Sequence, residues 1–479
     1  MPQFMRLRTA ILGLCLLLLD VPTWSRVFLR WTEPEAPPAK RVGVNELAVP
    51  WDASGIAVFK GLAKQGYQIY AEVSPDQADA AAVIAKEALT GIILNPGTTS
   101  QNQVADVLCR LRSAYPKLVF RIVNANGKQP QMRSRLVINR NGILEVTSST
   151  AQPWIDTNLA LVKLERAFHP PEVPLYSFHW DSEKNEQLPA PTAEDYGLAV
   201  AEAGAFDADI ILPLPASLQK DMAQNSSAAW EIWNEVKRYF AFVSTTTNRH
   251  SDSNSNVGVV TDDSGASYEA LNLLARHNIL FRVLRPSDFN ERNLEHLDVL
   301  IAFVTPDARA IPVISVFAAK GGTAVLVDSH GAYPWRSSQP IRNSENSASH
   351  AVGKGRVIEL SEPVSDPETF AQDVRRLIDN QKMEISLWNA LTTVAVLHRS
   401  ADQDVGTIEL LNYAEEPLRV QVRVKGFRST IRYETPEHGC CESLKPTQHD
   451  GFTEFVVPSL HVAGRVHLGS EHAHGRVQR

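Results

Sequence analysis

The residues with the clearest potential for chemistry stand at the end of one apolar segment. Val173–Phe178 is followed at once by His179, Trp180 and Asp181. A strand whose carboxyl end changes abruptly into acidic and aromatic side chains is where α/β barrels place their reacting groups. A helix pattern and a second apolar strand follow as far as Pro215, so the segment is typical of one β–α–β unit.

Acids also stand near the ends of other predicted strands. Alternation over residues 67–74 turns Glu72 away from the apolar side that faces helices, so we expect Glu72 to point inward. The same alternation puts His179 and Asp181 together on the inward side. Neighbouring titratable groups can acquire the separated pKa values that acid/base chemistry requires. A salt bridge or a satisfied hydrogen-bond network is the competing interpretation for each of these acids.

The segments that must position these residues alternate between strands and helices over residues 41–249. Such alternation implies parallel strands covered by helices, and seven or eight units within about 200 residues fit a (β/α) TIM-like barrel. The glycine-rich phosphate turn of a dinucleotide-binding fold is missing from the junctions, which disfavours that alternative. The predicted barrel strands are Val42–Val49, Gln68–Val73, Gly91–Leu94, Leu118–Val123, Ile143–Ser148, Pro174–Trp180 and Asp209–Leu214.

Two further domains are predicted after a polar linker at residues 250–256. Residues 257–381 again alternate between strand and helix patterns, which is typical of a three-layer α/β domain. From Ile385 the apolar period changes to two, so residues 384–468 are predicted to form a small C-terminal β-sandwich. Residues 469–479 are predicted to be a disordered tail.

Composition and charge argue against some classes of function. The chain has 479 residues, of which 44% are hydrophobic, and a formal net charge of −7. A general nucleic-acid-binding protein would need a basic face, so no nucleic-acid partner is expected. Cys109 lies in a helix pattern and is predicted to be a buried thiol. The adjacent Cys440 and Cys441 form neither a disulfide framework nor a metal-ligand spacing, so no metal and no cofactor are predicted.

The N-terminal segment predicts export. Arg6 and Arg8 precede an apolar run over residues 10–19, which is too short to span a bilayer comfortably. The run fits a secretory signal peptide over residues 1–25, followed by a Pro-rich tether over residues 26–40. An uncleaved membrane anchor is the alternative. We therefore expect a periplasmic or extracellular protein, which contacts a membrane only if this segment is retained.

Five short segments, together with the order of the domains, point to a known arrangement. They are Val257-Gly-Val-Val-Thr-Asp-Asp263, Val299-Leu-Ile-Ala-Phe-Val304, Ala318-Ala-Lys-Gly-Gly-Thr-Ala-Val-Leu-Val327, Gly353-Lys-Gly-Arg-Val357 and Leu410-Leu-Asn-Tyr413. In these the chain resembles the family 42 β-galactosidases and related bacterial glycoside hydrolases. The resemblance implies a carbohydrate ligand and a middle domain like a class I glutamine amidotransferase, through which a homo-oligomer forms. No cysteine occurs between Cys109 and Cys440, so the middle domain lacks the nucleophile of that amidotransferase chemistry.

The chain departs from the resemblance where catalysis is expected. Many retaining barrel glycosidases, including family 42, carry an Asn-Glu pair after the fourth strand, in which Glu is the acid/base. Here the predicted fourth strand ends in Asn124-Ala125, and the predicted nucleophile strand ends in Leu212-Pro-Leu-Pro215 without a carboxylate. Either the acids come from other strands, or the barrel is not a hydrolase of that type.

Two functions stay open. The first is an exported glycoside hydrolase-like protein in which Glu72 and Asp181 are the carboxylate pair and His179 tunes one of them. Glycoside cleavage needs two carboxyl groups, about 5 Å apart for retention or roughly 6.5–9.5 Å apart for inversion. The second is a non-catalytic glycan-binding or assembly protein on a degenerate glycosidase scaffold. In both, the carbohydrate is expected at the barrel mouth, held by Trp51, Asn95, Asn124, Glu145 and Trp180.

Overall fold

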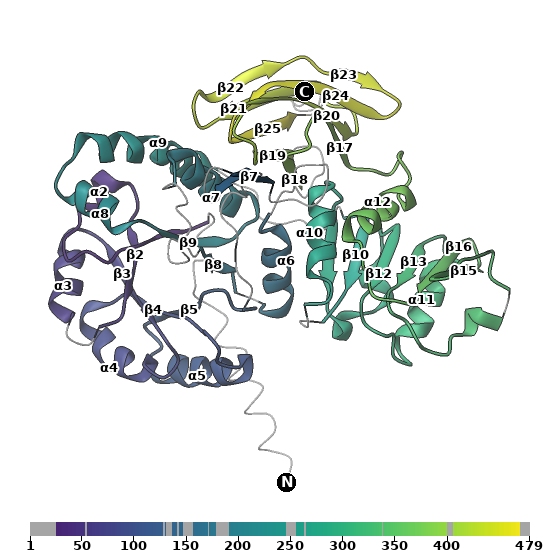
Figure 1. Cartoon of the computed structure of the whole chain (residues 1–479), viewed down its shortest axis with the longest axis horizontal. Coiled ribbons are helices and arrows are strands. Elements are labelled where there is room, and N and C mark those ends of the chain that lie inside the picture. Colours follow the sequence, from purple (N-terminus) through teal and green to yellow (C-terminus); the bar gives the residue numbers. More distant parts are fainter. Residues whose placement is uncertain are drawn as a thin grey trace, which may run out of the picture.

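The protein consists of a barrel, an α/β domain beside it and an antiparallel sandwich that lies over both (Figure 1). The computed structural model describes residues 25–52, 55–127, 130, 137–140, 143–146, 157–170, 172–178, 191–245, 255–262, 265–337, 339–399 and 406–469. The predicted linker, the tail after residue 469 and nearly all of the predicted signal segment lie outside these residues. None of the helices in the described ranges is long and apolar enough to cross a membrane.

Seven parallel strands form a nearly closed barrel, in the order β5-β4-β3-β2-β1-β9-β8. This confirms the predicted TIM-like architecture. The strands are β1 (Val27–Arg30), β2 (Glu46–Pro50), β3 (Gln68–Val73), β4 (Gly91–Leu94), β5 (Val119–Ile122), β8 (Leu175–Ser177) and β9 (Asp209–Pro213). The helices of this part are α2 (Ala39–Val42), α3 (Ile56–Lys64), α4 (Ala78–Ala88), α5 (Gln101–Ala114), α6 (Leu159–Phe168), α7 (Ala193–Ala205), α8 (Ala216–Ala223) and α9 (Ser227–Ser244).

Strand β1 lies in the middle of the barrel sheet, where the sequence predicted a tether. It pairs in parallel with β2 and with β9, so that Leu29 lies opposite both Leu47 and Leu212. The tether prediction over residues 26–40 is therefore wrong at its start, and α2 begins at its end. Val27–Arg30 lies between the apolar N-terminal run and a Pro-rich segment, so no preceding helix pattern marks it as part of the strand–helix alternation.

A hairpin replaces one of the predicted barrel strands. β6 (Val137–Arg140) and β7 (Ile143–Val146) pair antiparallel in a two-stranded sheet of their own, so the prediction of Ile143–Ser148 as a barrel strand is wrong. The sequence carried a signal for this arrangement. Asn141-Gly142 separates the two strands, and Asn-Gly between two apolar segments is typical of a two-residue hairpin turn.

The residue after β5, Asn124, joins the two ends of the barrel sheet. Its backbone N–H donates to the carbonyl of Leu175 at 2.9 Å. Its side chain accepts from the N–H of Ser177 at 3.0 Å and donates to the Ser177 carbonyl at 3.3 Å. The backbone of Asn124 is left-handed, with φ of 50°, a conformation that Asn adopts more readily than most residues. Asn124 thus connects β5 to β8 at the mouth, at the seam where the two ends of the barrel sheet meet.

The interior of the barrel follows the two-residue period of its strands. One buried apolar layer is formed by Phe28, Ala48, Tyr70, Ile93, Val123, Leu175 and Ile211. Residues two positions further along a strand face the same side, so Arg30, Glu72 and Asn95 project into the barrel mouth. The prediction that Glu72 points inward is confirmed by its pairing with Arg30 across the mouth.

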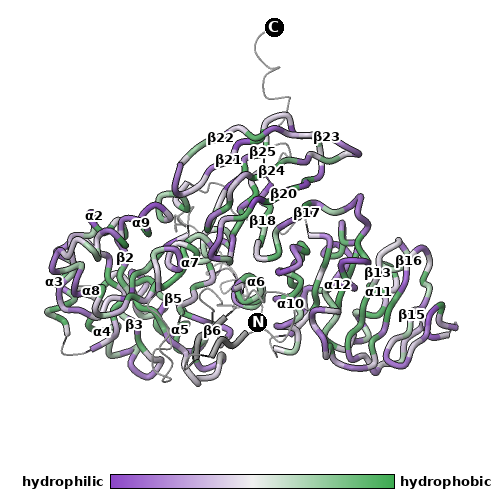
Figure 2. The backbone as a smooth tube through the Cα atoms, turned by 45° about the horizontal axis from the view of Figure 1, so that its top comes forward, coloured by the Kyte–Doolittle hydropathy of each residue, from purple (hydrophilic) through white to green (hydrophobic). Residues whose placement is uncertain are grey.

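The middle domain has three layers, as predicted. Its sheet order is β11-β10-β12-β13-β16-β15-β14. The first five strands in this order are parallel to one another. The last two, β15 and β14, each pair antiparallel with the strand before them in the order. Helices α10 and α12 pack against each other, and α11 packs on β13 and β16. The elements are β10 (Val257–Val260), α10 (Tyr268–Arg276), β11 (Phe281–Leu284), β12 (Val299–Ala302), α11 (Ala310–Ala319), β13 (Thr323–Leu326), β14 (Arg342–Asn343), β15 (Ser347–Val352), β16 (Gly355–Leu360) and α12 (Pro367–Leu377), with short 3-10 turns between β11 and β12 and after β13. Both views place α10 between α6 of the barrel and the middle sheet (Figure 1, Figure 2).

The C-terminal domain is the predicted β-sandwich. Its two sheets have the orders β17-β20-β24-β23 and β18-β19-β25-β21-β22, and a buried apolar cluster that includes Ile408, Val422 and Phe455 lies between them. The strands are β17 (Ile385–Trp388), β18 (Thr393–Arg399), β19 (Gly406–Asn412), β20 (Leu418–Lys425), β21 (Thr430–Thr435), β22 (Gly439–Leu444), β23 (Thr447–His449), β24 (Phe452–Leu460) and β25 (Ala463–Gly469). Val394, Leu411 and Val462 of this domain belong to the same core cluster as the barrel helices.

We expect Asn124→Ala to lower the free energy of unfolding by about 2–3 kcal/mol, because two hydrogen bonds are lost and Ala is strained in a left-handed backbone. Urea denaturation followed by Trp fluorescence measures the change. Asn389→Ala is the matched control: Asn389 is left-handed too, with φ of 58°, but is exposed and makes one side-chain bond to the Arg419 carbonyl. Equal losses in the two variants would contradict a seam role for Asn124.

Candidate functional site

The mouth of the barrel holds an open cavity of about 680 Å³ at the carboxyl ends of β1 to β4. Parallel barrels carry their chemistry at this end, because the loops that follow the strands converge there. Polar and aromatic side chains line the cavity, among them Arg30, Trp51, Glu72, Asp76 and Asn95. Three of the predicted site residues, Trp51, Glu72 and Asn95, are therefore brought together.

Glu72 of β3 is held by two side chains, Arg30 at the end of β1, two strands away, and Asn95 directly after the adjoining β4. The guanidinium of Arg30 donates to both carboxylate oxygens, with the Nε bond at 2.8 Å, and the side chains are 19% and 9% exposed. Asn95 Nδ2 adds a longer hydrogen bond at 3.5 Å. A two-pronged Arg–carboxylate pair fixes orientation as well as charge. Glu72 is thus a positioned carboxylate at the mouth, not a free one.

Trp51 supplies the aromatic face of the cavity. It is the residue after β2, and its backbone N–H donates to the Glu72 carbonyl at 2.9 Å. Its ring stacks on Phe59 of α3, with centroids 5.8 Å apart and an interplanar angle of 15°. Because Trp51 is only partly buried, one face of the indole is anchored while part of it remains accessible.

The opposite end of the barrel contains a second set of charges with a different role. Asp209, at the start of β9, accepts from Arg121 at 2.7 Å and from the backbone N–H of Arg26 at 2.7 Å. Burial raises the pKa of Glu46 and the charge of Asp209 adds to this, while Arg26 opposes it. These groups lie at the amino ends of parallel strands, where stabilising the fold rather than chemistry is the usual role.

The remaining predicted residues have different outcomes. His179, Trp180 and Asp181 lie outside the described residues, so their roles stay predictions. Glu145 belongs to the β6–β7 hairpin and not to a barrel strand, which removes the reasoning that placed it at the mouth. Asn124 lies at the seam, does not line the cavity of Trp51 and Glu72, and has both ends of its side chain occupied by Ser177.

Because β1 is the first barrel strand, the strands from β2 to β5 each move up by one in the count. The position where the family resemblance places the catalytic acid/base therefore changes. The fourth barrel strand is β4, and the residues that follow it are Asn95-Pro96, not Asn124-Ala125. The seventh is β9, which ends in Pro213 and is followed by Leu214-Pro215. Neither strand end carries a carboxylate, so the departure from the family 42 pattern persists at the corrected positions.

No protein-family model matches this sequence, and no curated protein matches it either. Solved structures do. α-L-Fucosidase isoenzyme 2 from Paenibacillus thiaminolyticus is 12% identical with a TM-score of 0.56, over 94% of this chain and 100% of that chain. This chain and the fucosidase share their fold. Exo-β-1,4-mannosidase Op5Man5 from Opitutaceae bacterium strain TAV5 is 11% identical with a TM-score of 0.50, over 76% of this chain and 100% of that chain.

A family 42 exo-carrageenase from Bacteroides ovatus is also similar, at 12% identity and a TM-score of 0.45, over 78% of this chain and 55% of that chain. At these identities the likeness concerns architecture. The fucosidase and the mannosidase confirm, at the level of the fold, the resemblance to glycoside hydrolases that the sequence suggested.

Sequence reasoning missed a buried carboxylate, Glu202, in the middle of α7. It accepts hydrogen bonds from Tyr413 of the sandwich, from Asn158 Nδ2 at 2.6 Å and from Tyr176 at 3.4 Å. Burial raises its pKa to about 7, against the opposing effect of those hydrogen bonds. A single Glu among the apolar residues of Val200-Ala-Glu-Ala-Gly204 was the available signal. Glu202 ties the barrel to the sandwich and is remote from solvent.

Sequence spacing also missed a group of side chains in the sandwich that are of types able to bind a metal ion. Glu434, Cys440, Cys441 and His467 come together there, although they span more than thirty positions of the sequence. Cys440 and Cys441 form a disulfide. The prediction that Cys109 is a buried thiol is wrong, because Cys109 of α5 is exposed.

We expect Glu202 to make stability fall with rising pH. The pKa is near 4.5 in the unfolded chain and about 7 in the folded protein, so the folded state binds more protons between these values. The contribution is complete below pH 4.5 and is lost as the pH rises to 7. Relative to Glu202→Gln, the wild type should lose roughly 3 kcal/mol between pH 4.5 and pH 8.

Urea denaturation of both proteins across this pH range measures the effect. Glu235→Gln, at an exposed position of α9, is the control and should follow the wild type at each pH. If the difference in unfolding free energy between the wild type and the Glu202→Gln variant does not change with pH, the assignment is contradicted.

Proposed function

We propose that this protein is a glycoside hydrolase-like protein that takes a carbohydrate into the mouth of its barrel. The observation that carries the proposal is the set of Arg30, Glu72, Asn95 and Trp51 around one cavity at the carboxyl ends of the strands. The fold shared with a fucosidase and a mannosidase supports a sugar as the ligand class.

The chemistry of these side chains suits a sugar. A carboxylate has about four lone-pair sites, of which Arg30 and Asn95 occupy three, so one remains to accept from a sugar hydroxyl. Because Arg30 fixes Glu72 before the ligand arrives, little conformational entropy is lost on binding. The accessible part of Trp51 offers a flat apolar surface to the C–H face of a pyranose ring.

Hydrolysis is the further step that this pocket would perform with a second carboxylate. Glu72 is the first, and Asp181 is our predicted second. Their separation would set the stereochemical outcome. The absence of an acid after β4 and β9 supports the second candidate function, a glycan-binding or assembly protein that does not cleave its ligand.

We also propose that the protein is exported by cleavage near Ser25. Strand β1 begins at Val27, so this cleavage leaves the barrel complete. An uncleaved anchor is the alternative, and the intact mass of the protein purified from cells distinguishes the two. Oligomer formation through the middle domain stays a prediction of the family resemblance.

Trp51→Ala should weaken carbohydrate binding at least about 10-fold, because it removes the apolar face that a sugar would cover. The measurement is binding to a glycan array that includes fucosides, mannosides and galactosides, followed by calorimetry with the best ligand. Trp388→Ala is the matched control, since Trp388 is 44% exposed on the sandwich and far in sequence from the barrel. Equal binding by the Trp51 and Trp388 variants would contradict the proposed site.

If the wild type cleaves chromogenic glycosides, Glu72→Gln and Asp181→Asn should each lower kcat by about 10²–10⁴-fold, the usual worth of acid/base groups. Asp221→Asn, an exposed residue of α8, should keep wild-type turnover. Unchanged kcat in both site variants would remove these two residues from the mechanism. Binding without turnover in the wild type would select the non-catalytic function.

A further inference from the structure

We propose that Glu434, Cys440, Cys441 and His467 form a binding site for a thiophilic divalent cation such as Zn²⁺, which opens when the Cys440–Cys441 disulfide is reduced. One ligand atom from each residue lies within 4.8 Å of all the others. Thiolate, imidazole and carboxylate are the ligand types of tetrahedral zinc sites, and the thiolate pair selects soft metals over Mg²⁺ or Ca²⁺.

The register of three neighbouring strands builds the cluster. β21 lies between β22 and β25, with Glu434 opposite Cys440 on one side and Arg432 opposite His467 on the other. Successive residues of a regular strand point to opposite faces. The pairing of β21 with β22 shifts between Tyr433 and Glu434, which leaves Cys441 without an opposite residue, as in a β-bulge. A bulge re-aims side chains, and here it brings two consecutive sulfur atoms to one side.

The cluster is open to solvent, as an exchangeable site must be. Cys440 is exposed, and both cysteines line a cavity of about 620 Å³ at the edge of the sandwich. An entry path of this kind and a ligand set of the right number are the checkable features of a metal site. Cys109 is exposed as well, but among the described residues it belongs to no group of three or more side chains whose ligand atoms lie close enough together to hold a metal ion.

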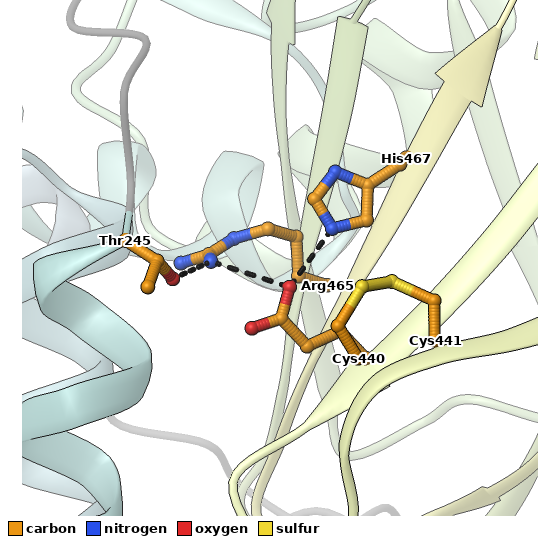
Figure 3. Close-up of a disulfide and its surroundings, with 6 residues drawn as sticks. Thr245, Cys440, Cys441, Arg465 and His467 are labelled. Atoms are coloured by element: carbon orange, nitrogen blue, oxygen red, sulfur yellow. Dashed lines mark hydrogen bonds and ion pairs between the residues drawn. A yellow bond between two sulfur atoms is a disulfide. The ribbon is translucent and has the colours of Figure 1, made fainter.

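The charges around the cluster are suited to a bound divalent cation. Figure 3 shows His467 directed at the carboxylate that the nearby Arg465 also approaches, with the disulfide beside them. His467 Nε2 lies 2.9 Å from Glu434 Oε2, and Arg465 lies 3.7 Å from the same atom. Two thiolates and one carboxylate around a divalent cation carry a net charge of −1. Arg465 is also paired with Glu409 at 2.6 Å and hydrogen-bonded to Thr245, so it is held in place beside that charge without occupying a ligand position.

The disulfide and the metal exclude each other. A tetrahedral ion with Zn–S bonds of about 2.3 Å needs two separate thiolates, whereas the disulfide joins the same two sulfur atoms. A dithiol reductant transfers two hydrogens, breaks the Cys440–Cys441 bond and becomes a cyclic disulfide itself. The two protein thiols then bind the cation as thiolates and release two protons, and the proton on His467 Nε2 moves to Nδ1.

The test is a titration of the full chain with ZnCl₂ in two states, as purified with the disulfide and after reduction with dithiothreitol followed by anaerobic desalting. Reduced protein should bind one Zn²⁺ per chain at least about 100-fold more tightly than oxidised protein. Co²⁺ in place of Zn²⁺ should give the thiolate-to-metal absorption that histidines and carboxylates alone do not produce.

Replacing both cysteines (Cys440→Ser with Cys441→Ser) should abolish the tight site and the Co²⁺ absorption, and His467→Ala should weaken binding at least about 10-fold. Cys109→Ser is the control and should bind as the wild type does. Thermal unfolding without metal verifies that each variant is folded. We expect the serine variants to fold, because Cys440 is exposed. Equal Zn²⁺ binding by the reduced wild type and the double serine variant, or by the two redox states, would overturn the proposal.

Discussion

The pairing of β1 with both β2 and β9 is the interaction on which the barrel depends. Without β1, the sheet would divide into β5-β4-β3-β2 and β9-β8, two open pieces with exposed edges. The same strand also shapes the barrel mouth, because Arg30 at the end of β1 orients Glu72 at the end of β3. Closure of the fold and construction of the site therefore share one strand.

The two-residue period of the strands divides the barrel interior into levels with different properties. Asp209 and Arg121 pair at the amino ends, an apolar layer around Phe28 and Tyr70 fills the middle, and Arg30 with Glu72 faces solvent at the mouth. The apolar layer separates two sets of charges that would otherwise compete for partners. Burying a charge costs little free energy only when the charge is paired, and each set is paired within its own level.

Buried polar contacts, as well as apolar packing, hold the domains together. Glu202 of α7 binds Tyr413 of the sandwich, while Arg465 of β25 binds Glu409 within the sandwich and the end of α9 through the Phe242 carbonyl at 3.1 Å. An unpartnered group at such a place would cost the full desolvation free energy, so these contacts favour one arrangement of the domains. The proposed cation site adjoins this second junction through Arg465.

The sequence by itself determined the local elements, the three-domain order and the inward side of Glu72, because apolar periodicity depends on residues close together in the chain. It did not reveal β1, which no helix pattern precedes, and it mistook β7 of the hairpin for a barrel strand. Only the tertiary structure decided which side chains meet: Arg30 with Glu72, Glu202 with Tyr413, and Cys440 with His467. Such meetings depend on strand order, on register and, at Cys441, on a one-residue bulge, none of which is encoded by neighbours in sequence.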